Sequence, residues 1–283
     1  MDLPLVLLDA IIARALAEDL SAGDITTEAC VDAQATAVAH AVARTPMIAC
    51  GGQVFARVFQ KVDESLLVTI HVADGAHVSA GARLWTVSGG AASVLSGERV
   101  ALNLTQRMTG VATLTARYVA AIAPGTKTRV TDTRKTTPGL RVLERYAVRK
   151  GGGHNHRDHL GSAVLIKDNH IVACGGAGVA VLRAKAHATH TCRIACEVDR
   201  LDQLEEVIAA GADIVLLDNM STDVVREAVR MAAGRVVLEA SGGITFDRVR
   251  ELSLLGVDVI SVGALTHSAP AADIGLDFEL SIK

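Results

Sequence analysis

DTRKTTPGLRVLERYAVRKGGGHNHRDHLGSAVLIKDNH, residues 132–170, directly follows one apolar run and contains a second near its end. The apolar runs at 128–130 and 163–166 predict two strands, and residues 139–150 predict a helix between them. Charged residues follow each strand at once, DTRK after the first and KDNH after the second. Cations held on rigid strand ends suit a small polyanion better than a long flexible partner.

From residue 126 onward the sequence alternates short apolar strands with helical segments. Repeated strand–helix units imply parallel strands joined by right-handed crossovers. Gly211 and Gly256 each follow a predicted helix and precede a buried strand, which is a weak internal repeat. The predicted strands lie at 128–130, 163–166, 193–198, 213–217, 235–240 and 257–262, and the helices at 139–150, 177–188, 201–210, 222–233 and 246–255.

Polar or glycine residues follow every one of these strands. An open doubly wound sheet concentrates its site at one switch point, whereas a barrel collects all its strand ends around one mouth. The pattern therefore favours an α/β barrel, left incomplete by having only six or seven strands. The residues concerned are Asp132 to Lys135, Lys167 to His170, Glu197 with Asp199, Asp218 with Asn219, Glu239 to Gly243, and Gly263 to His267.

The residues before this region predict a different unit. Asp9, Arg14 and Glu18 interrupt the apolar residues of 5–20 at helical spacing, which predicts an amphipathic helix and not a signal peptide. Residues 35–87 predict mainly short alternating strands. A long helix is predicted from 100 to 123, before the helix-ending pair Pro124-Gly125.

The stretch DGAHVSAGARL, residues 74–84, has the spacing of lipoyl and biotinyl hammerhead folds. Its two glycines suit tight turns between short strands. No lysine occupies a Met-Lys-Met type of turn tip nearby, so the stretch predicts a shape and not a cofactor carrier.

Composition narrows the function classes. Half of the 283 residues are apolar and only 2% are aromatic, which is typical of an α/β core of small aliphatic side chains. The net charge of -3 argues against nucleic acid or an anionic membrane as a partner. No apolar run reaches the roughly 18 residues that span a bilayer. The five cysteines show no disulfide spacing, and Cys192 and Cys196 are interpreted as core thiols in a reducing cytosol.

Three kinds of chemistry converge at the strand ends. Arg134, Lys135, Arg157 and Lys167 are cations that can bind carboxylate or phosphate. Glu197 and Asp218 follow neighbouring strands, where carboxylates can hold Mg²⁺ or sugar hydroxyls. The turns Ser241-Gly242-Gly243 and Val262-Gly263-Ala264 offer backbone N–H groups to a phosphate. Together they indicate a substrate with a sugar phosphate and acidic groups.

Each of these signals alone has a purely structural explanation. A single Arg or Lys after a strand is usually a solvated rim charge, and an Asp there often caps the next helix. His154, His156 and His159 form a loop cluster that could instead bind a metal, although loop histidines are more often surface residues. A barrel metalloenzyme and a non-catalytic sugar-phosphate sensor therefore remain as alternative classes. The agreement of all the strand ends favours an enzyme.

Several longer motifs closely resemble the quinolinate phosphoribosyltransferase family, also called nicotinate-nucleotide pyrophosphorylase (carboxylating). The motifs are DTRKTTPGLR, AVRKGGGHNHR, LIKDNH, CEVD, LLDNM, LEASGGI and VGALTHSAPAADIGLD, and they occur in the family's order. A ModD-like relative linked to molybdenum transport shares DTRK-type motifs and is the alternative. The complete NHR and KDNH motifs favour the first family.

The resemblance implies a two-domain subunit. It predicts an N-terminal α/β sandwich at 1–108, to which a tail at 270–283 returns, and an incomplete α/β barrel at 109–269. It also implies a reaction, in which quinolinate and phosphoribosyl pyrophosphate (PRPP) give nicotinate mononucleotide, pyrophosphate and CO₂ with Mg²⁺ as cofactor. This is a step of de novo NAD synthesis, expected in the cytoplasm.

The resemblance also assigns site residues. Arg99 would reach into the neighbouring subunit's site, so a homodimer is the smallest active unit, and further assembly is left open. Catalytic roles fall to Lys135, Lys167, Glu197 and Asp218, with Glu197 and Asp218 as candidate Mg²⁺ ligands. The quinolinate-binding set is Arg99, Arg134, Lys135, His156, Arg157 and Lys167, and the phosphoribosyl-binding set is Glu197, Asp218, Ser241, Gly242, Gly243, Gly263 and His267.

Overall fold

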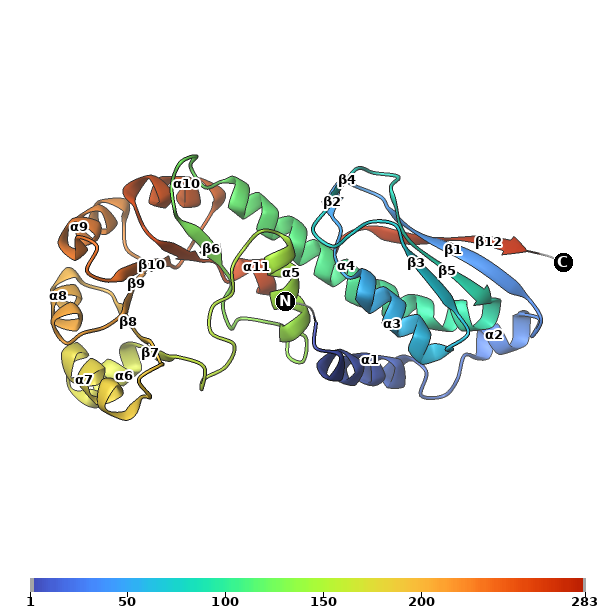
Figure 1. Ribbon diagram of the computed structural model, residues 1–283, viewed down its shortest axis with the longest axis horizontal. Helices are drawn as coiled ribbons and strands as arrows, with labels where there is room; N and C mark the ends of the chain where they lie inside the picture. Colours follow the sequence, from blue (N-terminus) through green and yellow to red (C-terminus); the bar gives the residue numbers. More distant parts are fainter. Residues whose placement is uncertain (1–2, 282–283) are drawn as a thin grey trace. The chain divides into compact units, whose positions relative to one another are not determined.

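The computed structural model describes residues 3–281, which form two compact units (Figure 1). The first unit contains the residues up to 116, residues 136–152 and the residues from 265 onward. The second contains residues 117–135 and 153–264. These units are defined by contacts in space, and the domain boundaries expected after residues 108 and 269 remain predictions.

An antiparallel sheet forms the centre of the first unit. Its strand order is β12 (Ile274–Ser281), β1 (Thr36–Ala43), β5 (Arg83–Gly90) and β3 (Leu67–Ile70). β1 is central and pairs along its whole length with β12, the last strand of the chain. β2 (Met47–Ile48) and β4 (His77–Val78) form a second, two-stranded antiparallel sheet. The predicted α/β sandwich is therefore confirmed in class.

The rest of the first unit is largely helical. It contains α1 (Leu5–Asp19), α2 (Ile25–Cys30), α3 (Gly52–Val62), the long α4 (Ala91–Ala120) and α5 (Arg141–Lys150). Phe55 and Phe59 of α3 are fully buried, and the Phe55 ring centroid lies 5.1 Å from that of Trp85 on β5. An aromatic cluster between one helix and the sheet is thus part of the core of this unit, beside many buried aliphatic side chains.

Residues 35–87 contain five short strands as predicted, and α3 interrupts them. One predicted boundary in the first unit was wrong. The long helix begins at Ala91 and not near residue 100. Gly97 lies inside this helix. A Cβ at this position would come within 2.9 Å of the Phe59 ring. This glycine allows close packing against α3 and does not end a helix.

The second unit is built on a six-stranded parallel sheet. Its order is β6 (Arg129–Thr131), β11 (Val259–Ser261), β10 (Val237–Ser241), β9 (Ile214–Asp218), β8 (Ile194–Val198) and β7 (Val164–Ile166). Helices α6 (Asp168–Cys174), α7 (Ala177–His187), α8 (Leu201–Ala209), α9 (Thr222–Ala232) and α10 (Phe246–Leu255) connect the strands. The short α11 (Ala264–His267) follows β11. The predicted strands and parallel pairing are confirmed.

Among the described residues, β6 and β7 each pair with one strand of the sheet only, so the barrel is incomplete as predicted. An isolated bridge between Thr131 and His154 extends the pairing of β6 on its free side. The loop that carries the predicted cations is thereby attached to a strand. No helix in the described part of the chain is long and apolar enough to cross a membrane.

The cysteine interpretation is confirmed for one thiol and wrong for the other. Cys196 on β8 is buried, and burial raises the pKa of its thiol from the ordinary 9.0 to about 12. Cys192 is only half-buried, because it precedes β8 and lies outside the strand. All five cysteines are free thiols.

Candidate active site

The carboxyl ends of the six parallel strands lie along one edge of the sheet of the second unit. Glu197 on β8 and Glu239 on β10 are both register partners of Leu216 on β9, and Ser241 is the partner of Asp218. Partners in a parallel ladder face the same side, and so do residues two apart on one strand. Glu197, Asp218, Glu239 and Ser241 therefore share one face of the sheet, near its carboxyl edge.

Lys167 joins these carboxylates from the neighbouring strand. It directly follows β7, and its Nζ lies 2.6 Å from Glu197 Oε2. The Glu197 side chain is 14% exposed and that of Lys167 is 48% exposed, so the pair lies where the sheet opens to solvent. The Lys167 backbone N–H donates to His170 Nδ1 at 2.9 Å, which fixes the start of α6.

The turns after β9 and β10 contact one another closely. Asn219 adopts a left-handed backbone with φ 53°, and its N–H donates to the Ser241 carbonyl at 3.0 Å. Its side-chain Nδ2 donates to Asp218 Oδ2 at 2.9 Å. Gly242 has φ 90°, and a Cβ there would collide with Asn219 Oδ1. The predicted Ser-Gly-Gly turn thus needs glycine both for its backbone angle and for its contact with Asn219.

A buried carboxylate organises the loop that carries two of the predicted cations. Asp132 has no exposed surface and follows β6 directly. Its Oδ1 accepts from the His156 backbone N–H at 2.7 Å, and its Oδ2 accepts from Asn155 Nδ2 at 2.6 Å. The Asp132 N–H in turn donates to the His154 carbonyl at 3.1 Å. The loop is therefore held against the end of β6 by charge-assisted bonds.

The hydrogen bonds of His156 define its neutral tautomer. Its Nδ1 accepts from the Arg157 backbone N–H at 2.7 Å, so a neutral ring carries its proton on Nε2. Nε2 lies 3.4 Å from Oε1 of Glu239, whose residue is 3% exposed. That oxygen makes no geometrically acceptable hydrogen bond, so the approach is an electrostatic contact. His156 thus faces the carboxylate side of the sheet.

Arg157 and Arg134 form a pair of like charges in the second unit. Burial lowers the pKa of Arg157, and the nearby Arg134 guanidinium lowers it further. The Arg157 Nη1 donates to the Ala163 carbonyl at 3.0 Å, which ties the loop to the chain entering β7. Two close guanidinium groups attract anions strongly, because an anion relieves their mutual repulsion. Lys135, which is exposed, follows Arg134 in the chain.

The remaining predicted residues have different positions. Gly263 follows β11 in the second unit, whereas Arg99 and His267 belong to the first unit. Arg99 is exposed on α4, 4.0 Å from Glu98, and burial raises the pKa of Glu98. His267 is exposed at the end of α11, and its Nδ1 lies 2.6 Å from Ser268 Oγ. The second unit therefore contains every predicted site residue except Arg99 and His267.

Family models account for nearly the whole chain. Residues 24–109 match the quinolinate phosphoribosyl transferase N-terminal domain, and residues 111–277 match the C-terminal domain. The chain belongs to the quinolinate phosphoribosyltransferase family. The cation cluster and the carboxylate face described above are thus features of an enzyme of this family.

Curated relatives and solved structures agree with the family assignment. The chain is 42% identical to the probable nicotinate-nucleotide pyrophosphorylase [carboxylating] of Bacillus subtilis, over 93% of this chain and 91% of that protein. It is 43% identical to the Mycobacterium leprae enzyme of that name, over 94% and 95%. Its structure is similar to that of NadC from Streptococcus pyogenes, with a TM-score of 0.95, 38% identity and full coverage of both chains.

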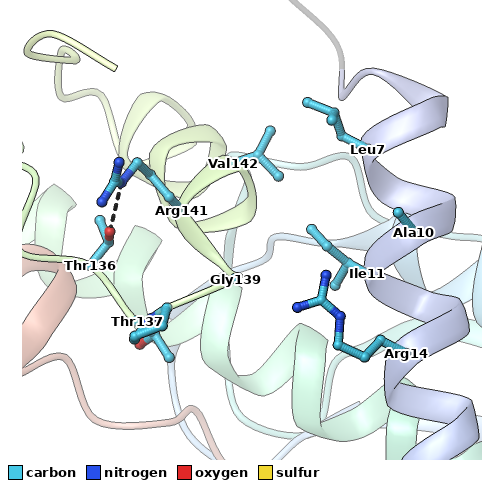
Figure 2. Close-up of a pocket in the computed structure, with 10 residues that line it drawn as sticks. Leu7, Ala10, Ile11, Arg14, Thr136, Thr137, Gly139, Arg141 and Val142 are labelled. Carbon is cyan, nitrogen blue, oxygen red and sulfur yellow. Dashed lines mark hydrogen bonds between the residues drawn. The ribbon is translucent and has the colours of Figure 1, made fainter. Parts of the chain in front are cut away.

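The first unit contains a separate groove of about 390 Å³ (Figure 2). Leu7 and Ile11 of α1 face Val142 of α5 across it, and Arg14 extends toward Gly139. Arg141 and Thr136 also line the groove, and Arg141 Nε donates to Thr136 Oγ1 at 2.9 Å. The groove is lined by none of the predicted site residues, so it is distinct from the strand-end site.

The histidine loop gives no support to the metalloenzyme alternative. His156 and His159 each use Nδ1 to accept a backbone N–H of the same loop, from Arg157 and Gly161. Within residues 3–281, no group of three or more His, Cys, Asp or Glu side chains is arranged to hold a metal ion. His156 and His159 are therefore explained by the hydrogen bonds that they accept within the loop.

Four residues of the site were not among those predicted. Asp132 and Asn155 position the cation loop, Asn219 positions Asp218, and Glu239 faces His156. Asp132, Asn219 and Glu239 were recognisable as polar residues at strand ends. Their separate roles were not, because those roles depend on which strands are neighbours in the sheet.

Proposed function

We propose that the strand-end site of the second unit binds quinolinate and PRPP. The chain is a phosphoribosyltransferase of NAD synthesis, which converts quinolinate and PRPP into nicotinate mononucleotide, pyrophosphate and CO₂. The carboxylating enzymes among the relatives favour this activity over that of a ModD-like relative. The observation that carries the proposed site is the Asp132 carboxylate, which holds the loop of His156 and Arg157 at the end of β6.

The cation cluster suits quinolinate. Quinolinate is a pyridine with two adjacent carboxylates, so it needs several donors in a fixed array. Arg134 and Arg157 supply guanidinium forks, His156 supplies a ring N–H, and Lys167 supplies a point charge. Lys135 is assigned to the same dianion and to the pyrophosphate. The repulsion between Arg134 and Arg157 supports this assignment, because it favours binding of a doubly charged ligand.

The carboxylate face suits the phosphoribosyl group. Glu197 and Asp218 are assigned to the ribose hydroxyls, and the 5′-phosphate to the turn Ser241-Gly242-Gly243, to Gly263 and to His267. Ser241 and Asp218 are register partners, which supports adjacent sites for ribose and phosphate. The left-handed Gly242 and Gly243 leave backbone N–H groups without a side chain in front of them.

The reaction then follows from positioning and electrostatics. The cations hold quinolinate so that its ring nitrogen faces the anomeric carbon of PRPP. The bond to pyrophosphate breaks as the new C–N bond forms, and Glu197 and Asp218 stabilise the positive charge that develops on the ribose. Lys135 and Lys167 stabilise the departing pyrophosphate. The N-ribosylated pyridinium accepts the electron pair left on C2 when CO₂ departs, and a proton from water then occupies that position.

Mg²⁺ is the proposed cofactor, and Glu197 and Asp218 are the residues that would hold it. They fit this ion, because Mg²⁺ in phosphate-transfer sites is bound by one or two carboxylates together with substrate phosphates. When bound, it would neutralise charge on the pyrophosphate of PRPP. The two carboxylates lie on neighbouring strands and face the same side of the sheet.

A homodimer with shared sites and a cytoplasmic location complete the proposal. Arg99 is exposed on α4 in the first unit, and the salt bridge with Glu98 is long at 4.0 Å, so its guanidinium is available to a partner subunit. Five free thiols are typical of a reducing compartment.

The deciding experiment is an assay of the purified protein with quinolinate, PRPP and Mg²⁺, followed by release of CO₂ and pyrophosphate. Nicotinic acid in place of quinolinate is the control acceptor. We expect nicotinate mononucleotide from quinolinate and no product from nicotinic acid. Product from nicotinic acid alone would overturn the proposal.

A further inference from the structure

A buried ion pair in the first unit connects two segments that carry proposed substrate-binding residues. Glu144 of α5 has no exposed surface, and the side chain of Arg107 on α4 is 21% exposed. The Arg107 Nε lies 2.9 Å from Glu144 Oε1, and Nη2 lies 2.8 Å from the same oxygen. Such a pair is costly to desolvate, and well-packed apolar residues are often equally stable in its place. Stability alone is therefore a poor explanation for it.

The remaining bonds of Arg107 point to the turn that contains His267. Nη1 donates to the Ala269 carbonyl at 2.7 Å, and Nη2 also donates to the Thr266 carbonyl. The guanidinium thus binds one carbonyl on each side of His267. Because the donors of a guanidinium have fixed directions, this arrangement sets the position of the turn and not only its attachment.

The same turn of α4 holds the chain beyond His267. Gln106 Nε2 donates to the Ile274 carbonyl at 2.8 Å, and the Gln106 carbonyl accepts from the Ala272 N–H at 2.9 Å. At Gly110 a Cβ would collide with the Pro270 carbonyl oxygen, so the two backbones are in close contact. Residues 106–110 of α4 therefore hold the segment from 266 to 274 in place through hydrogen bonds and close backbone packing.

Glu144 extends the arrangement to a second segment. Its other oxygen, Oε2, accepts from the Thr137 backbone N–H at 3.1 Å. Thr137 comes two residues after Lys135, and its segment lines the groove of Figure 2. The Glu144 carboxylate thus binds both Arg107, which holds the His267 turn, and the segment that follows Arg134 and Lys135 in the chain.

We infer that Arg107 and Glu144 are positioning residues for PRPP, acting through the His267 turn and the segment after Lys135. The inference rests on the proposed function, in which His267 binds the 5′-phosphate and Lys135 contacts both the pyrophosphate and quinolinate. His156 and Arg157, in contrast, are positioned by Asp132 in the second unit. Loss of the ion pair should therefore weaken PRPP binding more than quinolinate binding, because only PRPP also depends on the His267 turn.

The first test is Arg107→Lys, which keeps the charge but offers three donors on one nitrogen in place of the four bonds that Arg107 makes from three nitrogens. We expect KM for PRPP to rise about 10- to 100-fold and KM for quinolinate to rise by a clearly smaller factor. The matched control is Arg57→Lys, because Arg57 makes a bidentate pair with Asp9 at 2.7 Å in the same unit. That variant should keep both KM values. Equal changes in both KM values of Arg107→Lys would overturn the inference.

The second test is coupling to His267. If Arg107 acts through His267, the KM effect for PRPP of Arg107→Lys combined with His267→Ala should be smaller than the product of the single effects. Independent, multiplicative effects would contradict the inference. Should Arg107→Lys fail to fold, Arg107→Met with Glu144→Met replaces it, because it removes both charges. An unchanged PRPP KM in that folded double variant would also contradict it.

Failure of the inference can be distinguished from failure of the proposed function. The wild-type protein is assayed in the same series with quinolinate and PRPP. An inactive wild-type protein contradicts the function, whereas an active wild-type protein with a normal Arg107→Lys variant contradicts only the positioning role.

Discussion

At the scale of single residues, Asp132 determines where the proposed quinolinate-binding loop lies. It is fully buried, and its two oxygens accept from the His156 backbone and the Asn155 side chain. The three residues come from two parts of the chain that the bridge between Thr131 and His154 brings together. The position of His156 thus depends on a residue that need not touch the substrate.

Asp132→Asn should lower both stability and quinolinate affinity. An amide offers one acceptor oxygen, so one of the two donors loses its partner, at a cost of about 2 kcal/mol of unfolding free energy. Urea denaturation measures the stability, and titration with quinolinate measures the affinity. A variant that loses stability but binds quinolinate normally would contradict the positioning role of Asp132.

Arg134→Ala tests the cation cluster directly. We expect quinolinate binding to be lost while the thermal unfolding temperature stays close to that of the wild type, because the side chain is partly exposed and relieves repulsion at Arg157 when removed. Calorimetric titration with quinolinate and a thermal melt check both parts. Unchanged binding would remove Arg134 from the site.

The free thiols should differ sharply in reactivity. Burial raises the pKa of Cys196 to about 12 and raises that of Cys50 as well, whereas Cys30 is exposed. At about pH 8, iodoacetamide should modify Cys30 first and leave Cys196 and Cys50 unmodified until the protein is unfolded. Mass spectrometry of the labelled peptides measures this order.

The raised thiol pKa values also give a direction for stability against pH. A raised folded-state pKa means that the folded protein holds the proton more tightly than the unfolded chain. The associated stability is complete below the ordinary thiol pKa of 9.0 and declines as the pH rises from there toward about 12.

At the scale of elements, the turns after the parallel strands show which glycines the site requires. Gly242 follows β10 at the carboxyl edge and contacts Asn219, whereas Gly234 precedes β10 at the opposite end, where an added Cβ would meet only open space. Both have positive φ, at 90° and 74°. Substituting each glycine in turn therefore distinguishes the effect of backbone strain from the effect of losing the contact with Asn219.

Gly242→Ala should abolish most activity, whereas Gly234→Ala should retain it. Each places alanine in the left-handed region at a cost of about 1–3 kcal/mol, but only the first displaces Asn219 and with it Asp218. Steady-state assays with varied PRPP, beside thermal melts of both variants, make the comparison. Similar activity in both would contradict a phosphate-binding role for the turn.

Sequence patterns predicted most elements with clear periodicity, but α3 was missed although Val54, Phe55, Val58 and Phe59 recur at helical spacing. All six parallel strands were predicted within two or so residues, because each is a short apolar run ending in polar residues. Helix α6 was missed because none of its residues is buried, so no apolar stripe marks it. The long helix α4 was shortened because Gly97 resembles a helix boundary until its contact with Phe59 is known.

The site was predictable to a similar extent. Cations and carboxylates at strand ends were found because the end of an apolar run is visible in the sequence. The bond between Lys167 and Glu197 and the contact between His156 and Glu239 were not. Both depend on the spatial strand order, which places β7 beside β8 and puts only β11 between β6 and β10.

At the scale of the whole molecule, the proposed dimer predicts complementation between inactive variants. Arg99→Ala and Arg134→Ala should each be inactive alone, because each removes a cation from every site. Random mixing gives half mixed dimers with one intact site each, so about one quarter of the wild-type activity should return. Refolding the two variants together and assaying product measures this. No recovery at all would contradict a shared site.

The pairing of β1 with β12 has a consequence for how the protein is made. β1 is central in its sheet, yet one of its two partners, β12, is synthesised only after every strand of the parallel sheet. Until then β1 has an open edge, and the parallel sheet of the second unit is synthesised during that interval. Long-range pairing of this kind slows folding, and an open edge invites association with other chains. We therefore expect nascent or truncated chains that lack β12 to depend on chaperones far more than the finished protein does.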